Sequence, residues 1–285
     1  MKITVIFITI LALMFTSCAT GQKAAGESSS APPEAAGGAP DGQIPVETKS
    51  SVLFADGSLD EYLTSDYDSS LTTLLSQNRY SASGALMEQM EYAYQEDQGW
   101  LTTKITRDVE NRLKTRVVYE YDSQGRMIRE TLVNKSGKAV SSYAYGYDEK
   151  GNRVSRTVNS GTGVKLAETT YTFNNAGLVA ASETKDGSGN KINSAENQYD
   201  ASGNLITQKV YNARGEITTM INTTWQDGVE VETEQTDSNG TVQIRIVNEY
   251  GPGRELIRRK VENIQGQSTQ ILQYEYTFKS RRHSS

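Results

Sequence analysis

The chain has only one cysteine and one histidine among its 285 residues. A single cysteine excludes an intrachain disulfide. The only histidine, His283, lies in the terminal segment 280–285, which we expect to be a solvated tail, so a histidine triad or a histidine metal site is not available. We predict a protein that is not an enzyme, with no catalytic residues, no metal site and no cofactor.

Proline is scarce: four of the five prolines lie before residue 51, and none occurs between Pro45 and Pro252. A proline-free stretch suits a sheet, because proline cannot donate to the ladder. Residues 18–51 are rich in glycine, alanine, serine and proline, and they hold too few large apolar residues to offset the entropy of ordering. We therefore predict a flexible linker over 18–51 and a folded domain over 52–279.

Basic residues are outnumbered, with 29 Lys and Arg against 35 Asp and Glu and a net charge of −6. This balance gives no general attraction to phosphate, so we predict no nucleic-acid partner. One basic cluster, Arg254, Arg258, Arg259 and Lys260, is expected on a hairpin surface. There it could contact anionic headgroups or glycans.

Long apolar runs are also missing, with one exception near the start. Lys2 precedes a run of 13 residues, Ile3 to Phe15. The run is too short for a transmembrane helix, which needs about 20 residues, and it suits the apolar core of an export signal. Residues 1–17 are therefore predicted to be a signal peptide.

The end of this signal, Phe15-Thr16-Ser17-Cys18, resembles the lipobox of bacterial lipoproteins. Phe15 stands where that family usually has leucine. The resemblance implies cleavage before Cys18, covalent diacylglycerol and acyl lipid (palmitate) on that residue, and a membrane-anchored protein of the bacterial cell envelope. The orientation, periplasmic or on the cell surface, stays open. The alternative is a plain secretory signal with an incidental cysteine.

What the chain has in abundance is a repeat of about 26 residues. Aromatic residues followed by a turn recur every 25 or 26 positions, at Tyr121, Tyr147, Phe173, Tyr199, Trp225, Tyr250 and Tyr276. A second series of glycines keeps the same interval, at Gly137, Gly163, Gly189, Gly215, Gly240 and Gly266. A fixed period of this size indicates an array built from one supersecondary unit.

Within each unit, large residues alternate with small or polar ones, as in Tyr143-Tyr145-Tyr147. A period of two is typical of strands and puts the large residues on one face. Turn signals recur every 11 to 14 residues and predict 17 turns and about 18 strands. We predict an all-β fold: an elongated antiparallel meander of hairpin repeats, twisted or partly curled.

The turns share an aromatic-Asp/Asn-x-x-Gly motif: YDSQG, YDEKG, FNNAG and YDASG. Its side-chain oxygen can accept hydrogen bonds from backbone amides just ahead, and its glycine takes positive φ in a bulged hairpin. The predicted turn residues are Asp122, Gly125, Asp148, Gly151, Asn174, Gly177, Asp200 and Gly203. Calcium is the alternative use of these oxygens, but a single carboxylate per turn, and Asn174 in place of one aspartate, favour turn chemistry.

These turns resemble the YD (RHS) repeats of bacterial envelope proteins and toxin shells. The opening DGSLDEY and the 26-residue unit resemble repeat lipoproteins of treponemes and related spirochaetes. The resemblance covers residues 52–279 and implies β-hairpin repeats in a winding sheet. A shared fold does not fix a shared function.

The equal repeat length should bring tyrosines into ladders across the sheet, with Tyr119, Tyr143, Tyr145 and Tyr171 foremost. Such a ladder either packs within the fold or stacks on sugar rings. The leading hypothesis is a non-catalytic binding or adhesion module for a protein or glycan. The alternative is a structural, scaffolding envelope lipoprotein with no small ligand. A transmembrane barrel would need a continuous apolar outer band, which the charged pair Arg129-Glu130, one residue on each face, argues against.

Overall fold

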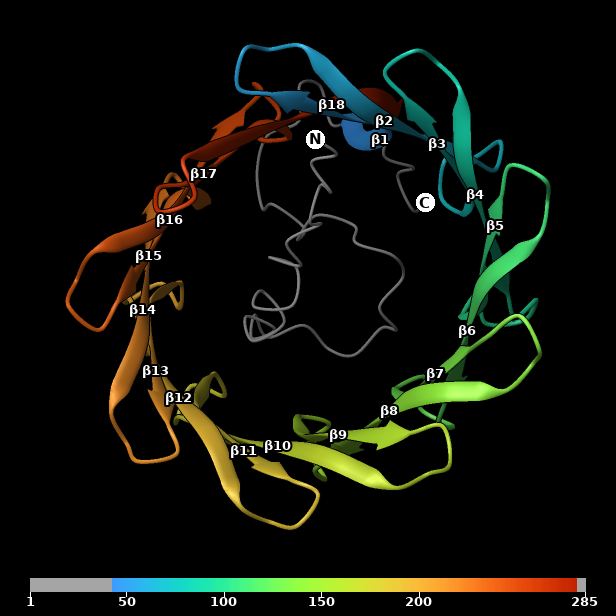
Figure 1. Ribbon diagram of the computed structural model, residues 1–285. Helices are drawn as coiled ribbons and strands as arrows, with labels where there is room; N and C mark the ends of the chain where they lie inside the picture. Colours follow the sequence, from blue (N-terminus) through green and yellow to red (C-terminus); the bar gives the residue numbers. More distant parts are fainter. Residues whose placement is uncertain (1–42, 281–285) are drawn as a thin grey trace.

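The computed structural model describes residues 43–280, which form 18 antiparallel strands (Figure 1). The strands are β1 (Gln43–Phe54), β2 (Leu59–Tyr67), β3 (Leu74–Ser81), β4 (Leu86–Tyr94), β5 (Leu101–Asp108), β6 (Leu113–Tyr121), β7 (Met127–Val133), β8 (Ala139–Tyr147), β9 (Arg153–Ser160), β10 (Lys165–Phe173), β11 (Val179–Asp186), β12 (Lys191–Tyr199), β13 (Leu205–Asn212), β14 (Ile217–Gln226), β15 (Val229–Asp237), β16 (Val242–Tyr250), β17 (Leu256–Asn263) and β18 (Ser268–Ser280). The predicted all-β fold and strand number are confirmed.

Several predictions fall outside the described residues: the signal peptide, the lipobox, Cys18, most of the linker and His283. Between residues 43 and 280, no helix has the length and apolar character needed to cross a membrane. The first strand begins at Gln43 rather than at Val52, so residues 43–51 belong to the sheet and not to a linker. Ser280, assigned to the tail, is the last residue of β18.

The sheet is closed, and the prediction of an elongated meander is wrong on this point. Each strand pairs with the next one in sequence, and β18 also pairs with β1, from Gln43 opposite Ser280 to Phe54 opposite Gln270. The right-handed twist of a sheet coils a long meander, and closure then removes the two unpaired edges. The strands of this seam have 12 and 13 residues and are the longest in the barrel.

The two faces of the barrel differ in exposure to water. Cross-strand register places the Arg79–Glu61 ion pair on one face, with side chains 21% and 17% exposed. It places Lys185 and Glu183 on the other face, with side chains 52% and 40% exposed. Because the concave side of a one-layer cylinder is the more screened from water, the face with Arg79 lines the interior. We call it the lumenal face and the opposite one the outer face.

The enclosed space is wide. With strands about 4.8 Å apart, 18 strands give a perimeter of about 86 Å and a diameter of at least about 27 Å. Barrels of this strand number are too wide for their own side chains to fill. Consistent with this, no large side chain in residues 43–280 is fully buried. Stability must therefore come from strand pairing and from contacts along each face.

The two ends of the barrel carry different connections. The aromatic-Asp turns, such as β6–β7 and β8–β9, lie at one end, the YD end. Because Gln43 pairs with Ser280, both ends of the described chain lie there too. The nine hairpins from β1–β2 to β17–β18 lie at the other end, the crown, and Figure 1 shows their tips splayed away from the axis.

The turn motif works through its side-chain oxygen. Oδ1 of Asp148 accepts hydrogen bonds from the backbone amides of Lys150 (3.0 Å) and Asn152 (2.7 Å). Asp122, Asn174 and Asp200 do the same in their turns. The partner glycines Gly125, Gly151, Gly177 and Gly203 have φ between 77° and 87°. Hydrogen bonds from the Asn204 side chain and backbone hold the pKa of Asp200 below its ordinary value.

Sequence reasoning missed that the crown hairpins use the same device. Oδ1 of Asp186 accepts from the amides of Ser188 and Asn190, both at 2.9 Å. The equivalent acceptors in other hairpins are Asp108, Asn134, Ser160, Asn212 and Asp237. The available signal was an Asp, Asn or Ser three residues before each glycine of the second series.

Candidate functional site

The aromatic anchors form a belt at the YD end. Each belt residue donates a hydrogen bond of 2.7–2.9 Å to the backbone carbonyl of the residue 20 positions earlier, on the neighbouring hairpin. The donors are Tyr94, Tyr121, Tyr147, Tyr199, Trp225, Tyr250 and Tyr276. Phe173 holds the equivalent place without a hydroxyl group. The belt therefore ties neighbouring hairpins together, and its role is structural.

A second set of tyrosines lines the lumen. All four tyrosines of the predicted ladder share the lumenal face, and one more joins them. They are Tyr92 in β4, Tyr119 in β6, Tyr143 and Tyr145 in β8, and Tyr171 in β10. We call these five residues, with Lys104, Glu130, Arg153 and Arg156, the lumenal tyrosine stripe.

Cations lie over several of these rings. The Arg156 guanidinium carbon is 4.9 Å from the centre of the Tyr143 ring, and that of Arg153 is 5.1 Å from the centre of the Tyr145 ring. Lys104 Nζ lies 5.4 Å from the centre of the Tyr92 ring. Such contacts hold a cation on an aromatic face. The stripe is thus a layer of alternating rings and positive groups rather than a row of bare stacking platforms.

Burial sets the ionisation of the stripe. Burial, and then the charge of Glu130, raises the pKa of Tyr145, whose hydroxyl donates to Glu130 Oε2 at 3.2 Å. Burial raises the pKa of Tyr92 to about 12. Burial also lowers the pKa of Lys104, against the raising effect of Glu130 and Glu88. At neutral pH the tyrosines keep their protons and can donate hydrogen bonds into the lumen.

One donor in the stripe is unused within the described chain. The Arg156 Nε atom is buried and has no hydrogen-bond partner among residues 43–280. A buried unsatisfied donor is costly, and each such group in a native structure calls for an explanation. A ligand acceptor, either a carboxylate or a hydroxyl oxygen, would satisfy it.

The opposite wall of the lumen is chemically different and internally satisfied. Gln208 Nε2 donates to Asn197 Oδ1 at 2.9 Å, and Asn197 Nδ2 donates to the Val179 carbonyl at 3.0 Å. Arg259 Nε donates to Asn248 Oδ1 at 2.8 Å. These amides hold one another in place, so the tyrosine stripe is the better candidate site.

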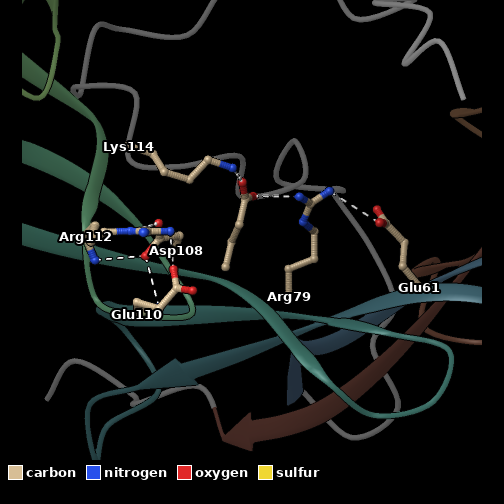
Figure 2. Close-up of polar contacts among 7 residues, drawn as sticks. Glu61, Arg79, Asp108, Glu110, Arg112 and Lys114 are labelled. Atoms are coloured by element: carbon tan, nitrogen blue, oxygen red, sulfur yellow. Dashed lines mark hydrogen bonds and ion pairs between the residues drawn. The ribbon is translucent and has the colours of Figure 1, made fainter. Parts of the chain in front are cut away.

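A chain of ion pairs crosses the lumenal face near the crown. Figure 2 shows Arg79 between Glu61 and a second carboxylate, with Lys114 beyond. The distances from Arg79 are 3.3 Å to Glu61 Oε2 and 2.9 Å to Glu88 Oε2, and Lys114 also pairs with Glu88. The charges balance, so this cluster stabilises β2 to β6 without creating a strong local field. Figure 2 also shows Asp108, Glu110 and Arg112 within the β5–β6 turn.

The remaining candidates carry little chemistry. A surface hollow of about 710 Å³ lies between the turns Asp148–Asn152 and Phe173–Gly177, but the Asp148 side chain is occupied by its own turn. In the described part of the chain, no group of three or more His, Cys, Asp or Glu could hold a metal ion. The predicted basic cluster is largely paired: Arg258 binds Glu249 and Lys260 binds Glu262.

Comparison with known proteins shows similarity of fold alone. No protein-family model matches the chain, and no curated protein sequence matches it. The crystal structure of TcdB2-TccC3 is 13% identical with a TM-score of 0.31, covering 74% of this chain and 16% of that one. The Photorhabdus luminescens Tc holotoxin pore is 12% identical with a TM-score of 0.31, covering 82% and 16%. The chain thus spans about a sixth of these toxin chains.

A porin-like protein from Bacteroides uniformis is 10% identical with a TM-score of 0.41, covering 81% of this chain and 98% of that one. These neighbours are consistent with a β-repeat fold like that of YD (RHS) shells. They do not indicate a ligand or a location.

Proposed function

We propose that the protein is a non-catalytic binding module of the bacterial cell envelope whose lumenal tyrosine stripe holds an anionic glycan. The observation that carries this proposal is the layered Tyr–Arg stripe with its unused Arg156 Nε donor. Aromatic rings offer apolar faces to sugar rings, while arginine offers charge-assisted hydrogen bonds to carboxylates. The stripe combines both.

The shape of the stripe suits a chain-like ligand. Tyr119, Tyr143 and Tyr171 lie on alternate strands β6, β8 and β10. Alternate strands are about 10 Å apart. A glycan that follows the wall across these strands would therefore meet a similar surface at each step. The equal repeat length produces this regularity.

The outer face favours a barrel surrounded by water, since it carries ion pairs such as Arg245–Glu234 at mid-strand. Attachment to the envelope is assigned to lipid on Cys18. We expect palmitate to label the wild type and not a Cys18→Ser variant. Equal labelling of the two would remove the anchor and would leave the lumenal site untouched.

The binding test uses detergent-purified protein and isothermal titration with soluble peptidoglycan fragments, which are acidic oligosaccharides. We expect saturable binding that weakens about tenfold in Arg156→Gln and in Tyr171→Ala, because each loses a contact of about 1–2 kcal/mol. Neutral chitin oligosaccharides should bind more weakly to the wild type. The melting temperature of each variant reports whether it still folds.

Matched controls come from the outer face, where Arg245 pairs with Glu234 and the Tyr211 hydroxyl donates to Glu196. The Arg245→Gln and Tyr211→Ala variants should bind as the wild type does. Equal weakening in lumenal and outer variants would contradict a lumenal site. Absence of saturable binding, together with stable co-purification with other envelope proteins, would favour the scaffolding alternative.

A further inference from the structure

Exposed apolar side chains gather at the crown, the end opposite the described termini. Eight of its nine hairpins carry at least one at or beside the turn: Phe54, Met87, Val109, Val140, Val164, Leu166, Ile192, Ile217 and Ile264. Single exposed apolar residues need no explanation. A concentration at one end, on tips that splay outward (Figure 1), does need one.

On three adjacent hairpins the apolar residues are accompanied by lysine. Lys138 precedes Val140 by two residues, Lys165 precedes Leu166, and Lys191 precedes Ile192. Val164 and Lys135 complete a set that we call the crown patch: Lys135, Lys138, Val140, Val164, Lys165, Leu166, Lys191 and Ile192. Its four lysines face one acidic residue, Asp186, in the tips 133–140, 160–166 and 186–192. The local excess of positive charge contrasts with the net charge of −6 for the chain.

Two glycines make the patch continuous. A Cβ atom on Gly161 would collide with the backbone carbonyl of Ala139 on the preceding hairpin, and one on Gly187 would collide with that of Lys165. The three tips therefore pack backbone against backbone. Their apolar residues form a row rather than separate points, with Val164 61% and Leu166 50% exposed.

We propose that the crown patch docks onto a lipid bilayer that contains anionic headgroups. Apolar side chains beside lysines are typical of interfacial binding, in which the apolar groups enter the headgroup boundary and the lysines meet phosphate. Self-association through this patch is disfavoured, because two copies would bring lysines against lysines. Among residues 43–280, Lys135 and Lys138 make no ion pair, so both can serve lipid phosphates.

The test places an environment-sensitive fluorophore on the patch. In the full chain carrying Cys18→Ser, Val164→Cys gives a single thiol for the fluorophore NBD, which reports only its own surroundings. With vesicles of phosphatidylglycerol and phosphatidylcholine in equal parts, NBD emission should rise about two-fold or more and shift to the blue. With phosphatidylcholine alone it should change little.

Leu75→Cys is the matched control, because Leu75 is 46% exposed but lies at the YD end. Its label should not respond to either vesicle. Replacing Lys135, Lys138, Lys165 and Lys191 by glutamine should weaken the response at position 164 about tenfold or more, since each lysine near an anionic surface adds about 1 kcal/mol.

Three outcomes would overturn the proposal: no response at position 164 to the anionic vesicles, an equal response from positions 75 and 164, or a response that grows with protein concentration without vesicles. The last would assign the patch to self-association.

Discussion

Cysteines introduced at Ser51 and Gln273 should form an intramolecular disulfide on oxidation. These residues are directly paired across the seam of β1 and β18, and paired strand residues lie within disulfide range. In an open meander they would be about 80 Å apart. Since the bond closes a loop of more than 200 residues, the oxidised form should gain about 5 kcal/mol of unfolding free energy. Urea unfolding of oxidised and reduced protein, in a Cys18→Ser background, measures this gain.

The control pairs Ser51→Cys with Lys185→Cys, which is also on the outer face but eight strands from the seam through β18. It should give no intramolecular bond and no gain in unfolding free energy. Disulfide-linked dimers alone from the Ser51/Gln273 pair would show that the seam does not form within one chain.

Replacing Tyr147 by alanine should cost about 3 kcal/mol of unfolding free energy. The ring lies under Arg126, whose guanidinium carbon is 4.8 Å from the ring centre, and its hydroxyl donates to the Met127 carbonyl at 2.7 Å. Truncation removes a large half-buried side chain together with both contacts. Tyr147→Phe keeps the ring and should cost only about 1 kcal/mol for the hydrogen bond. Chemical unfolding of both variants separates the two terms.

Tyr211→Ala provides the comparison, because its ring lies on the outer face away from the belt and its hydroxyl meets only the exposed Glu196. Its cost should stay under about 1 kcal/mol. If Tyr147→Ala were no more damaging than Tyr211→Ala, the aromatic belt would not be what ties the hairpins together.

The repeat and the strands could be predicted because both are local signals. The 26-residue period, the alternation and the turn motif all act within neighbouring hairpins. Closure could not be predicted in this way, because β1 and β18 are more than 200 residues apart and β1 lies outside the repeat. Pro45 also reads as a mark of a linker. It is tolerated because β2 pairs with β1 only over Lys49–Leu53, so the missing N–H of Pro45 costs no bond on that side.

The candidate site was predictable in composition but not in position. A period of two placed Tyr119, Tyr143 and Tyr171 on one face. A flat meander has no interior, however, so the sequence could not say that this face becomes the lumenal wall. The arginines over the rings follow from cross-strand register, as with Arg156 opposite Tyr145 and beside Tyr143. Register between strands becomes certain only when the turns and bulges are known.

The seam also changes what the repeat number means. In an open array, each added unit lengthens the molecule and leaves its cross-section unchanged. Here the strands of the seam stand outside the regular units, so loss or gain of one unit removes or adds two strands between the same closing partners. The perimeter would change by about 10 Å and the diameter by about 3 Å. Recombination between units would thus yield proteins of different bore and unchanged height, a direct route to ligands of different width.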